Sequence, residues 1–331
     1  MKTRLILLTI IIFSLPACIS YSDVSSSVKG DYSLIDLPAG YYTSVSWWSS
    51  DAIAFIYSES KTAFGINDKI YVFSPQTNQS YELYIPKRSE CRKELLTHLD
   101  KLPNGELGII INCFAEWIQP TLFGADENGN LEAIYKYPFS HDFNAGNYTF
   151  NNDMSIAFLE GRGGDPLGGT LYHAEITSDA DIEQIFADFK RVRSPAWSFD
   201  DKIIAFAGTE NYEGEITVFG DIVDLTNFPW DLYLMDSDGQ NLRFLLRGVV
   251  KANNIKWVPN HNTWLSFSGD YKGSEGIWIV NIETREVTRI WDQREAYDWS
   301  PDGTRLVIMT DNVDGYEDAH PVIVTAPKIE E

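Results

Sequence analysis

Short apolar runs separated by polar turns recur along the chain, and two of these segments are close in sequence. Ser194–Phe206 reads SPAWSFDDKIIAF, and Tyr297–Ile308 reads YDWSPDGTRLVI. In each segment a strand ends in Trp, a polar turn follows, and a second apolar strand begins. Asp and Gly tolerate the positive φ of a tight turn, so the pattern predicts a β-hairpin. A lone hairpin is marginally stable in water, so we expect the copies to stack.

Six copies of this hairpin are found along the chain. The residue that ends the first strand is Trp in four copies and polar in two: Trp47, Lys101, Thr149, Trp197, Trp257 and Trp299. A second hairpin follows each of the first five copies, at Lys69–Leu83, Thr121–Tyr135, Leu171–Phe186, Asp231–Leu246 and Gly276–Ile290. Two hairpins make a unit of four antiparallel strands, and such units arranged around an axis form a β-propeller.

The sixth unit lacks a strand at its C-terminal end, because only Pro321–Thr325 follows Ile308 as an apolar run. A missing outer strand would leave an exposed sheet edge, which proteins avoid. The run Tyr32–Leu37 precedes the first unit and belongs to none of the others. We therefore expect this run to supply the outer strand of the last blade. The expected fold is an all-β, six-bladed propeller with four antiparallel strands per blade.

The repeats also resemble those of a known family. SPAWSFDDKIIAF, DWSPDGTRLVI and DLYLMDSDGQNLRFLL are similar to the WD-like hairpin repeats of TolB-like six-bladed propellers. The resemblance extends over most of Tyr32–Thr325 and is degraded in Leu95–Tyr135 and Asn147–Phe186. It implies a fold more strongly than a function, because propellers carry many unrelated activities.

The first residues predict an export signal. Two basic residues precede the apolar run Leu5–Leu15, which is short for a membrane span. Leu15-Pro-Ala-Cys18 then resembles a bacterial lipobox, although Pro16 departs from the usual small or β-branched residue. The alternative is an ordinary secretory signal that is cleaved nearby. The expected organisation is a signal peptide over 1–17, a lipidated Cys18 with a flexible tether over 18–31, and the propeller domain over 32–331. The lipid would hold the chain outside the cytoplasm, on the cytoplasmic or the outer membrane.

The chain is strongly acidic, with 48 Asp and Glu against 26 Lys and Arg and a net charge of −22. Such a charge repels phosphate, so we expect no nucleic-acid partner and no membrane contact beyond the lipid anchor. Two interpretations of the charge remain open. It keeps an exported domain soluble, or part of it forms an acidic site for a cationic ligand.

Cys91 and Cys113 are the only cysteines besides Cys18. An exported pair can persist as a disulfide. A regular hairpin about Asn104-Gly105 would pair Cys113 with a residue near Leu96, so a bulge is needed to bring Cys91 within about 7 Å of it. A disulfide and two buried thiols are both open.

No motif for catalysis or metal binding is present: neither a Gly-x-Ser-x-Gly elbow nor a His-Glu-x-x-His pair occurs. Asp236–Asn241 is a short acidic stretch that fits a hairpin turn better than a calcium loop. We therefore expect no catalytic residue, metal ligand or cofactor. His98 and Asp100 precede the turn of the second unit, which would place them near the central channel.

Two long loops, Gly208–Trp230 and Asp311–His320, combine aromatic and acidic residues. With strand residues expected near the channel, they supply the candidate binding residues Arg193, Phe228, Trp230, Asn254 and Asp298. Aromatic anchors with a few charges are typical of contact surfaces. We expect a monomeric, non-catalytic propeller that binds an envelope protein or a saccharide. The alternative is a propeller-type polysaccharide lyase or glycosidase with its site at the channel mouth.

Overall fold

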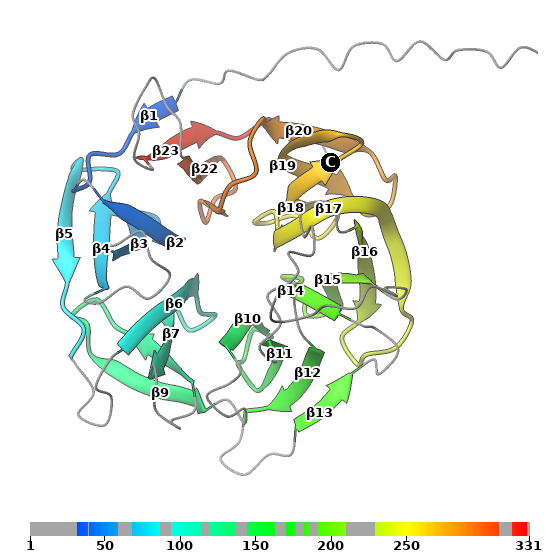
Figure 1. Ribbon diagram of the computed structural model, residues 1–331, viewed down its shortest axis with the longest axis horizontal. Helices are drawn as coiled ribbons and strands as arrows, with labels where there is room; N and C mark the ends of the chain where they lie inside the picture. The colour runs from blue at the N-terminus through cyan, green and yellow to red at the C-terminus, as the bar shows by residue number, and fades with distance from the viewer. Residues whose placement is uncertain are drawn as a thin grey trace, which may run out of the picture.

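The computed structural model describes residues 32–38, 40–58, 68–86, 94–113, 120–136, 144–162, 170–176, 182–185, 191–209, 229–310 and 320–329. These residues form strands and turns, and their antiparallel sheets stand around a central axis as the blades of a propeller (Figure 1). This part of the chain contains no helix, and so none that is long and apolar enough to cross a membrane.

The first three blades are separate four-stranded sheets. Blade 1 contains β2 (Tyr41–Ser49), β3 (Ala52–Ser58), β4 (Lys69–Ser74) and β5 (Gln79–Leu83). Blade 2 contains β6 (Glu94–Lys101), β7 (Leu107–Cys113), β8 (Thr121–Ala125) and β9 (Leu131–Lys136). Blade 3 contains β10 (Asn144–Phe150), β11 (Ile156–Arg162), β12 (Thr170–Glu175) and β13 (Ile182–Ile185). The predicted hairpins of these blades, including the two without Trp, are confirmed.

Blades 4 and 5 share one strand and so form a single seven-stranded sheet. Blade 4 contains β14 (Arg191–Trp197), β15 (Ile203–Thr209), β16 (Pro229–Asp236) and the first half of β17 (Arg243–Trp257). Blade 5 contains the second half of β17 with β18 (Trp264–Tyr271), β19 (Ser274–Asn281) and β20 (Val287–Trp291). The two halves of β17 pair with β16 and with β18, so one continuous strand joins the two blades.

The last blade is closed by the N-terminal strand, as the sequence predicts. Blade 6 contains β21 (Tyr297–Trp299), β22 (Arg305–Thr310), β23 (His320–Thr325) and β1 (Tyr32–Leu34), with β1 antiparallel to β23. Leu34 is exposed, whereas Ile35 directly after the strand is buried against blade 1. Among the described residues the strands thus make six four-stranded units.

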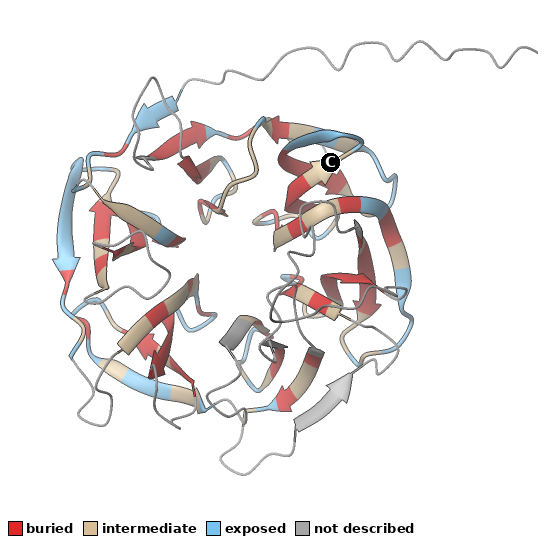
Figure 2. Cartoon of the chain, in the orientation of Figure 1, coloured by how far each residue is buried: buried red, intermediate tan, exposed pale blue. Residues whose placement is uncertain are grey.

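The hydrophobic core lies between the blades rather than inside one layer. The inner and middle strands carry most of the buried residues, while outer strands such as β5 are largely exposed (Figure 2). The four repeated Trp residues are all buried, and Trp47, for example, packs with residues of blades 1 and 6. The repeated Trp therefore serves packing between neighbouring blades, as expected for large aromatic side chains.

A bulge interrupts the inner strand in five blades of the described chain, a few residues before the Trp position. Within two of these bulges Ser194 and Asn254 have positive φ values of 51° and 47°. A bulge bends the strand and re-aims the side chains that follow it. The inner strands therefore turn their last residues toward the axis of the ring.

Candidate functional site

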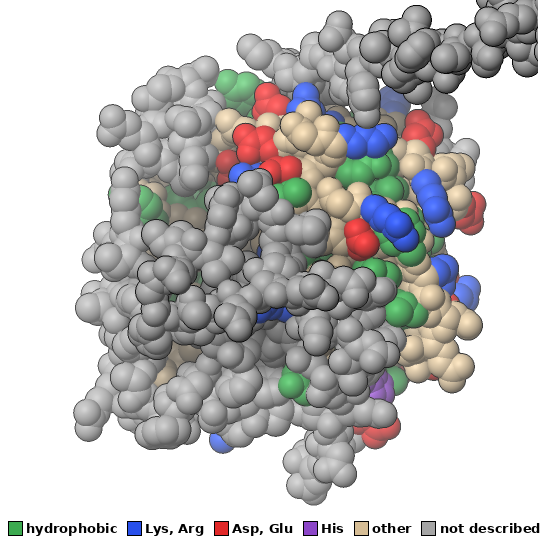
Figure 3. All heavy atoms as spheres, turned by 45° about the vertical axis from the view of Figure 1, so that its right-hand side comes forward, with side chains coloured by type: hydrophobic (Ala, Val, Ile, Leu, Met, Phe, Trp, Pro, Cys, Tyr) green, Lys and Arg blue, Asp and Glu red, His purple; other side chains and the backbone are tan. Residues whose placement is uncertain are grey.

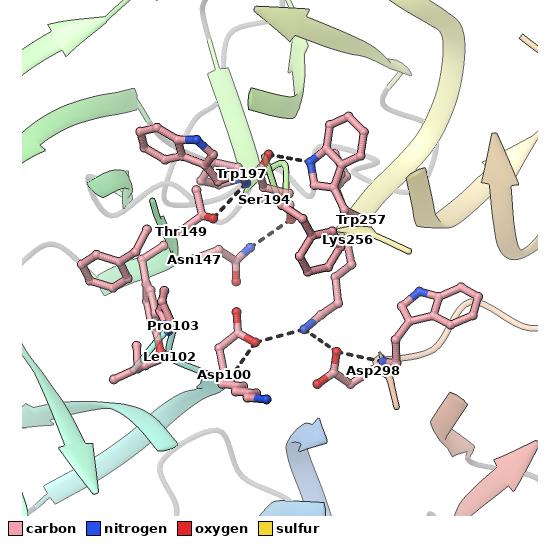
Figure 4. Close-up of a pocket in the computed structure, with 18 of the residues that line it drawn as sticks. Asp100, Leu102, Pro103, Asn147, Thr149, Ser194, Trp197, Lys256, Trp257 and Asp298 are labelled. Atoms are coloured by element: carbon pink, nitrogen blue, oxygen red, sulfur yellow. Dashed lines mark hydrogen bonds and ion pairs between the residues drawn. The ribbon is translucent and has the colours of Figure 1, made fainter. Parts of the chain in front are cut away.

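A cavity of about 370 Å³ lies at the centre of the ring (Figure 4). Every blade contributes to its wall through the residues around the Trp position: Trp47, His98 with Asp100–Pro103, Asn147–Phe150 with Asn152, Ser194–Phe199, Asn254–Trp257 with Pro259, and Asp298, Trp299 and Pro301. The wall thus combines charged, amide, aromatic and proline side chains. Such a mixed concave surface is typical of ligand sites.

Three charged side chains lie together in this cavity. Lys256 Nζ lies 2.8 Å from Asp298 Oδ1 and 3.3 Å from Asp100 Oδ1, and the side chains of Lys256, Asp298 and Asp100 are 20%, 10% and 31% exposed. Asp298 belongs to the neighbouring blade, whereas Asp100 belongs to blade 2, across the ring from blade 5 (Figure 4). Lys256 therefore ties opposite sides of the ring together.

Asp298 is also fixed by backbone donors. Its Oδ2 accepts a hydrogen bond of 2.7 Å from the Trp47 backbone N–H, and its Oδ1 accepts one of 2.9 Å from the Trp299 N–H. Both carboxylate oxygens are thus engaged by blades 1, 5 and 6. The side chain joins the last blade to the first and is held in one orientation.

The pKa values of Lys256 and of the neighbouring phenol of Tyr297 both lie far above neutral pH. Burial alone lowers the pKa of Lys256, but the charges of Asp100 and Asp298 and the hydrogen bond to Asp298 outweigh it and raise this pKa above its ordinary value. Burial raises the pKa of Tyr297 well above its usual range, although its bond to Ser266 opposes the shift. Lys256 therefore stays an ammonium and Tyr297 a neutral phenol at physiological pH.

Blades 3 and 4 line the cavity with neutral groups that a buried carboxylate orients. Glu160 on β11 is 0% exposed, and its Oε2 accepts hydrogen bonds from the Ser194 N–H at 3.0 Å and from Asn147 Nδ2 at 3.2 Å. Asn147 Nδ2 also donates to Ser194 Oγ at 2.9 Å, and Ser194 Oγ donates to Asn253 Oδ1 at 2.8 Å. The amide nitrogen of Asn147 is thus fully used, which leaves its carbonyl oxygen for the cavity.

These groups offer a fixed pattern of charge and hydrogen-bond acceptors. A general base or acid works best with a pKa near the operating pH, and Lys256 and Tyr297 are both shifted away from it. Within the described ranges no group of three or more His, Cys, Asp or Glu residues could hold a metal ion. The arrangement is suited to binding a ligand by complementarity.

Two of the five candidate residues, Asn254 and Asp298, line the cavity, as do His98 and Asp100, which the sequence placed near the channel. Asn254 contributes mainly its backbone, because its carbonyl oxygen accepts a 2.7 Å hydrogen bond from the Tyr297 hydroxyl. Asp298, which directly precedes Trp299 in the sequence, therefore belongs to the charged cluster.

Trp230 requires a correction. It is 1% exposed and packs in the core of blades 4 and 5, on β16, which lies between β15 and β17. The guanidinium of Arg193 stacks on that ring at 4.5 Å, and Arg193 is not among the residues that line the cavity. Burial removes the basis for a surface contact at Trp230. Phe228, most of the loop Gly208–Trp230 and residues 311–319 lie outside the described residues.

Cys113 is disulfide-bonded, whereas Cys18 and Cys91 lie outside the described residues. Its cross-strand partner is Glu94 and not a residue near Leu96, because the bulge between Leu96 and His98 shifts the register of β6. The shift moves the start of β6 in the direction that the pairing with Cys91 requires. That pairing stays a prediction.

The sequence interpretation missed Lys256, Asn147 and Glu160. One available signal is the position directly before each Trp or its substitute, occupied in turn by Ser46, Asp100, Tyr148, Ala196, Lys256 and Asp298. Five of these six residues line the cavity. Comparing that single position across the repeats would have brought the three charged residues together. Glu160, on a second strand, carries no such signal.

The outer edge of blades 4 and 5 shows several Lys and Arg side chains (Figure 3). Arg247 and Arg285 lie over the ring of Phe244 at 5.0 and 5.9 Å, and Arg289 lies over Trp278 at 5.7 Å. These guanidinium groups cover aromatic rings on β17 and β19. We interpret them as cover for the core and not as part of the cavity.

No protein-family model and no curated protein sequence matches the chain. Solved structures do resemble it. A putative TolB from Agrobacterium tumefaciens is 17% identical, over 75% of this chain and 79% of that one, with a TM-score of 0.53. TolB from Acinetobacter baumannii is 12% identical, over 83% and 64%, with a TM-score of 0.56. An oligogalacturonate lyase in complex with manganese is 10% identical, over 92% and 96%, with a TM-score of 0.54. The chain therefore has a TolB-like β-propeller fold, which is shared by proteins of different function.

Proposed function

We propose that the chain is an exported lipoprotein whose propeller binds a ligand or partner at the cell envelope through its central cavity, without catalysis. The observation that carries this proposal is the contact of Lys256 with both Asp100 and Asp298. Two carboxylates hold the ammonium in its charged form and occupy two of its N–H donors. The cavity then presents a constant electrostatic pattern, which favours selective binding.

Enzymes of the same fold need a group that gains or loses a proton or attacks a substrate. A lysine acts as a base or nucleophile when its pKa falls toward neutrality, and the pKa of Lys256 is shifted the opposite way. This shift favours the binding function over the lyase or glycosidase alternative. The TolB and lyase structures share the fold and do not decide between the two.

One experiment separates binding from turnover. Purified protein is incubated with soluble glycans and peptides released from an envelope fraction, and native mass spectrometry records both the bound and the free molecules. We expect a ligand that stays bound and keeps its mass. Accumulation of cleaved or eliminated products that ceases in an Asp100→Asn variant would establish the enzymatic alternative instead.

The proposed anchor is tested at Cys18. Two acyl chains suffice for stable membrane attachment, so Cys18→Ser should move the protein from the membrane fraction to the soluble extracytoplasmic fraction. Fractionation followed by immunoblotting measures the shift, with the unaltered protein as the reference. A Cys18→Ser protein that stays in the membrane fraction would contradict lipid anchoring.

A further inference from the structure

We propose that the cavity binds an ammonium or guanidinium group between Asp100 and Asn147, an inference that rests on the proposed binding function and names its ligand class. Figure 4 shows these two side chains pointing toward one another across the cavity, from blades 2 and 3. Both groups present oxygen atoms, which accept hydrogen bonds and do not donate them. A donor-rich cation is the partner that such a pair lacks.

The local charge favours a cation. Two carboxylates, Asp100 and Asp298, face one ammonium, Lys256, in ion pairs. Lys101 also lines the cavity, and the buried carboxylate of Glu160 lies behind Asn147, so these five groups carry three negative and two positive charges. The whole chain has a net charge of −22, which adds a field of the same sign. Charged walls around a cleft focus such a field and attract ligands of opposite charge.

The excess charge is accessible on Asp100 and not on Asp298. Both oxygens of Asp298 accept hydrogen bonds from the protein. On Asp100, Oδ1 accepts from the Lys101 N–H at 3.0 Å and from Lys256, whereas Oδ2 has no hydrogen bond to another residue described by the structure. With a side chain 31% exposed, Asp100 can offer Oδ2 to a ligand.

The second acceptor, the side-chain carbonyl oxygen of Asn147, is held in place by hydrogen bonds of the same amide, one of them to the buried Glu160. Glu160 and Ser194 take the two N–H donors of Asn147, so its amide cannot turn over without losing both hydrogen bonds. The Asn147 carbonyl oxygen is therefore directed into the cavity beside Asp100. Two preset acceptors suit the parallel N–H groups of a guanidinium or the divergent ones of an ammonium.

The mouth of the cavity suits the apolar stem that carries such a group. Phe199, at the turn of blade 4, is 46% exposed and lines the cavity, as do Pro103 and Pro259 from the turns of blades 2 and 5. Long cationic side chains and alkylamines place their methylene groups along apolar surfaces and their charged ends at polar ones. A ligand with its cationic end inside the cavity and its alkyl stem against the turn residues would therefore fit this wall.

The inference is tested with two probes that differ only in charge. N-acetylarginine amide and N-acetylcitrulline amide have nearly the same shape, but citrulline carries a neutral urea. Isothermal titration calorimetry at low ionic strength should show the arginine probe binding at least about tenfold more tightly, the ratio expected for loss of one charge-assisted hydrogen bond. This comparison uses the unaltered protein, so it does not depend on a variant that folds.

Two variants locate the site. Asp100→Asn keeps the shape of the side chain and should weaken binding of the arginine probe about tenfold, while Asp292→Asn, on the exposed surface after β20, should change it less than about twofold. Thermal melting confirms that both variants fold. Agmatine and the peptide Gly-Gly-Arg-Gly-Gly distinguish the source of the cation, since tighter binding of the peptide would indicate a protein segment.

Equal binding of the arginine and citrulline probes would overturn the inference, as would an Asp100→Asn variant that binds like the unaltered protein. Failure of both probes to bind would also overturn it. The broader binding function would still stand in each case if native mass spectrometry finds another ligand that is retained unchanged. The two proposals therefore fail separately.

Discussion

The two sides of the central cavity hold their polar groups by different means. On the side of blades 2, 5 and 6, the charged side chains of Asp100, Lys256 and Asp298 hold one another. On the side of blades 3 and 4, the buried carboxylate of Glu160 holds the neutral groups of Asn147 and Ser194. The first side is centred on the ion pairs of Lys256, with Asp298 also held by two backbone N–H groups, and the second is centred on a carboxylate that binds a backbone N–H within a bulge.

This difference has an energetic consequence. Removing Lys256 leaves Asp100, which is partly exposed to solvent, and Asp298, which keeps its two backbone donors. Removing Glu160 leaves the Ser194 N–H and the Asn147 amide without their acceptor inside the wall. A buried donor without a partner costs more than a partly exposed charge that loses one neighbour. We therefore expect the neutral side to contribute more to the stability of the fold and the ionic side more to the ligand.

The largest expected effect is that of Glu160→Ala. Because the variant leaves buried donors unpaired, the free energy of unfolding should fall by about 3 kcal/mol. Urea denaturation followed by Trp fluorescence measures the change. Glu283→Ala, at an exposed turn, is the control and should differ little from the unaltered protein. A loss below about 1 kcal/mol at Glu160 would remove the proposed difference between the two sides.

A smaller effect is expected for Lys256→Met, which leaves Asp100 and Asp298 without the cation between them. The free energy of unfolding at pH 7 should fall by about 1 to 2 kcal/mol. The control is Lys202→Met, whose ammonium pairs with Asp200 but has a side chain that is 75% exposed, so its loss should have almost no effect.

The pH dependence of Lys256→Met has a definite sign. Without the ammonium, the two carboxylates lose the cation between them and repel each other, and adding a proton to one of them removes that repulsion. The variant should therefore lose part of its deficit in stability, relative to the unaltered protein, when the pH is lowered. Denaturation curves of both proteins at pH 7 and pH 5 test this, and a deficit that is larger at the lower pH would contradict it.

The smallest effect is expected for Asp302→Asn, in the turn between β21 and β22. The hydrogen bond from Ser300, and further bonds from Thr304, lower the pKa of Asp302 below its ordinary value of 3.8. This stabilisation is present above that value and is lost as the pH falls through the lower folded pKa. Because the group is largely in contact with solvent, Asp302→Asn should cost only about 0.5 kcal/mol at pH 7.

The turn between β10 and β11 in blade 3 also contains an Asp, Asp153, which allows the two sides of the cavity to be compared at their turns. The Ser155 side chain lowers the pKa of Asp153 in the same way. Asp153→Asn and Asp302→Asn should therefore both reduce the acid-dependent part of the stability, in denaturation curves recorded between pH 7 and pH 3. Unequal behaviour would show that the two sides differ at their turns and not only in the cavity wall.

The sequence predicted the hairpins, their order and the closing strand because these depend on local patterns. Alternating apolar residues and Asp or Gly at the turn fix a hairpin, and an unpaired edge on the last blade leaves one place for Tyr32–Leu37. Even the hairpins that lack Trp, with Lys101 and Thr149, formed as predicted.

The cavity wall was only partly predictable. Asp298 and Asn254 were identified because they lie beside a recognisable Trp, but the partner of Asp298 is Lys256, on another blade. Such contacts depend on how the bulges turn the inner strands, and hydrophobic patterning does not reveal a bulge. Trp230 was misplaced for a related reason. Its position next to a long loop indicated exposure, whereas packing among the core residues of blades 4 and 5 buries it.

The most direct test of a cavity whose charges are fixed for binding is the pKa of Lys256 in solution. Protein labelled with 13C at the lysine ε-carbon gives one NMR signal per lysine, and the signal missing from Lys256→Met identifies the residue. Because Asp100 and Asp298 hold the ammonium, the pKa of Lys256 should lie above the ordinary value of 10.5, so its signal should stay unchanged from pH 6 to pH 10. A signal that titrates near neutral pH would contradict the account and indicate a lysine prepared for proton transfer or nucleophilic attack.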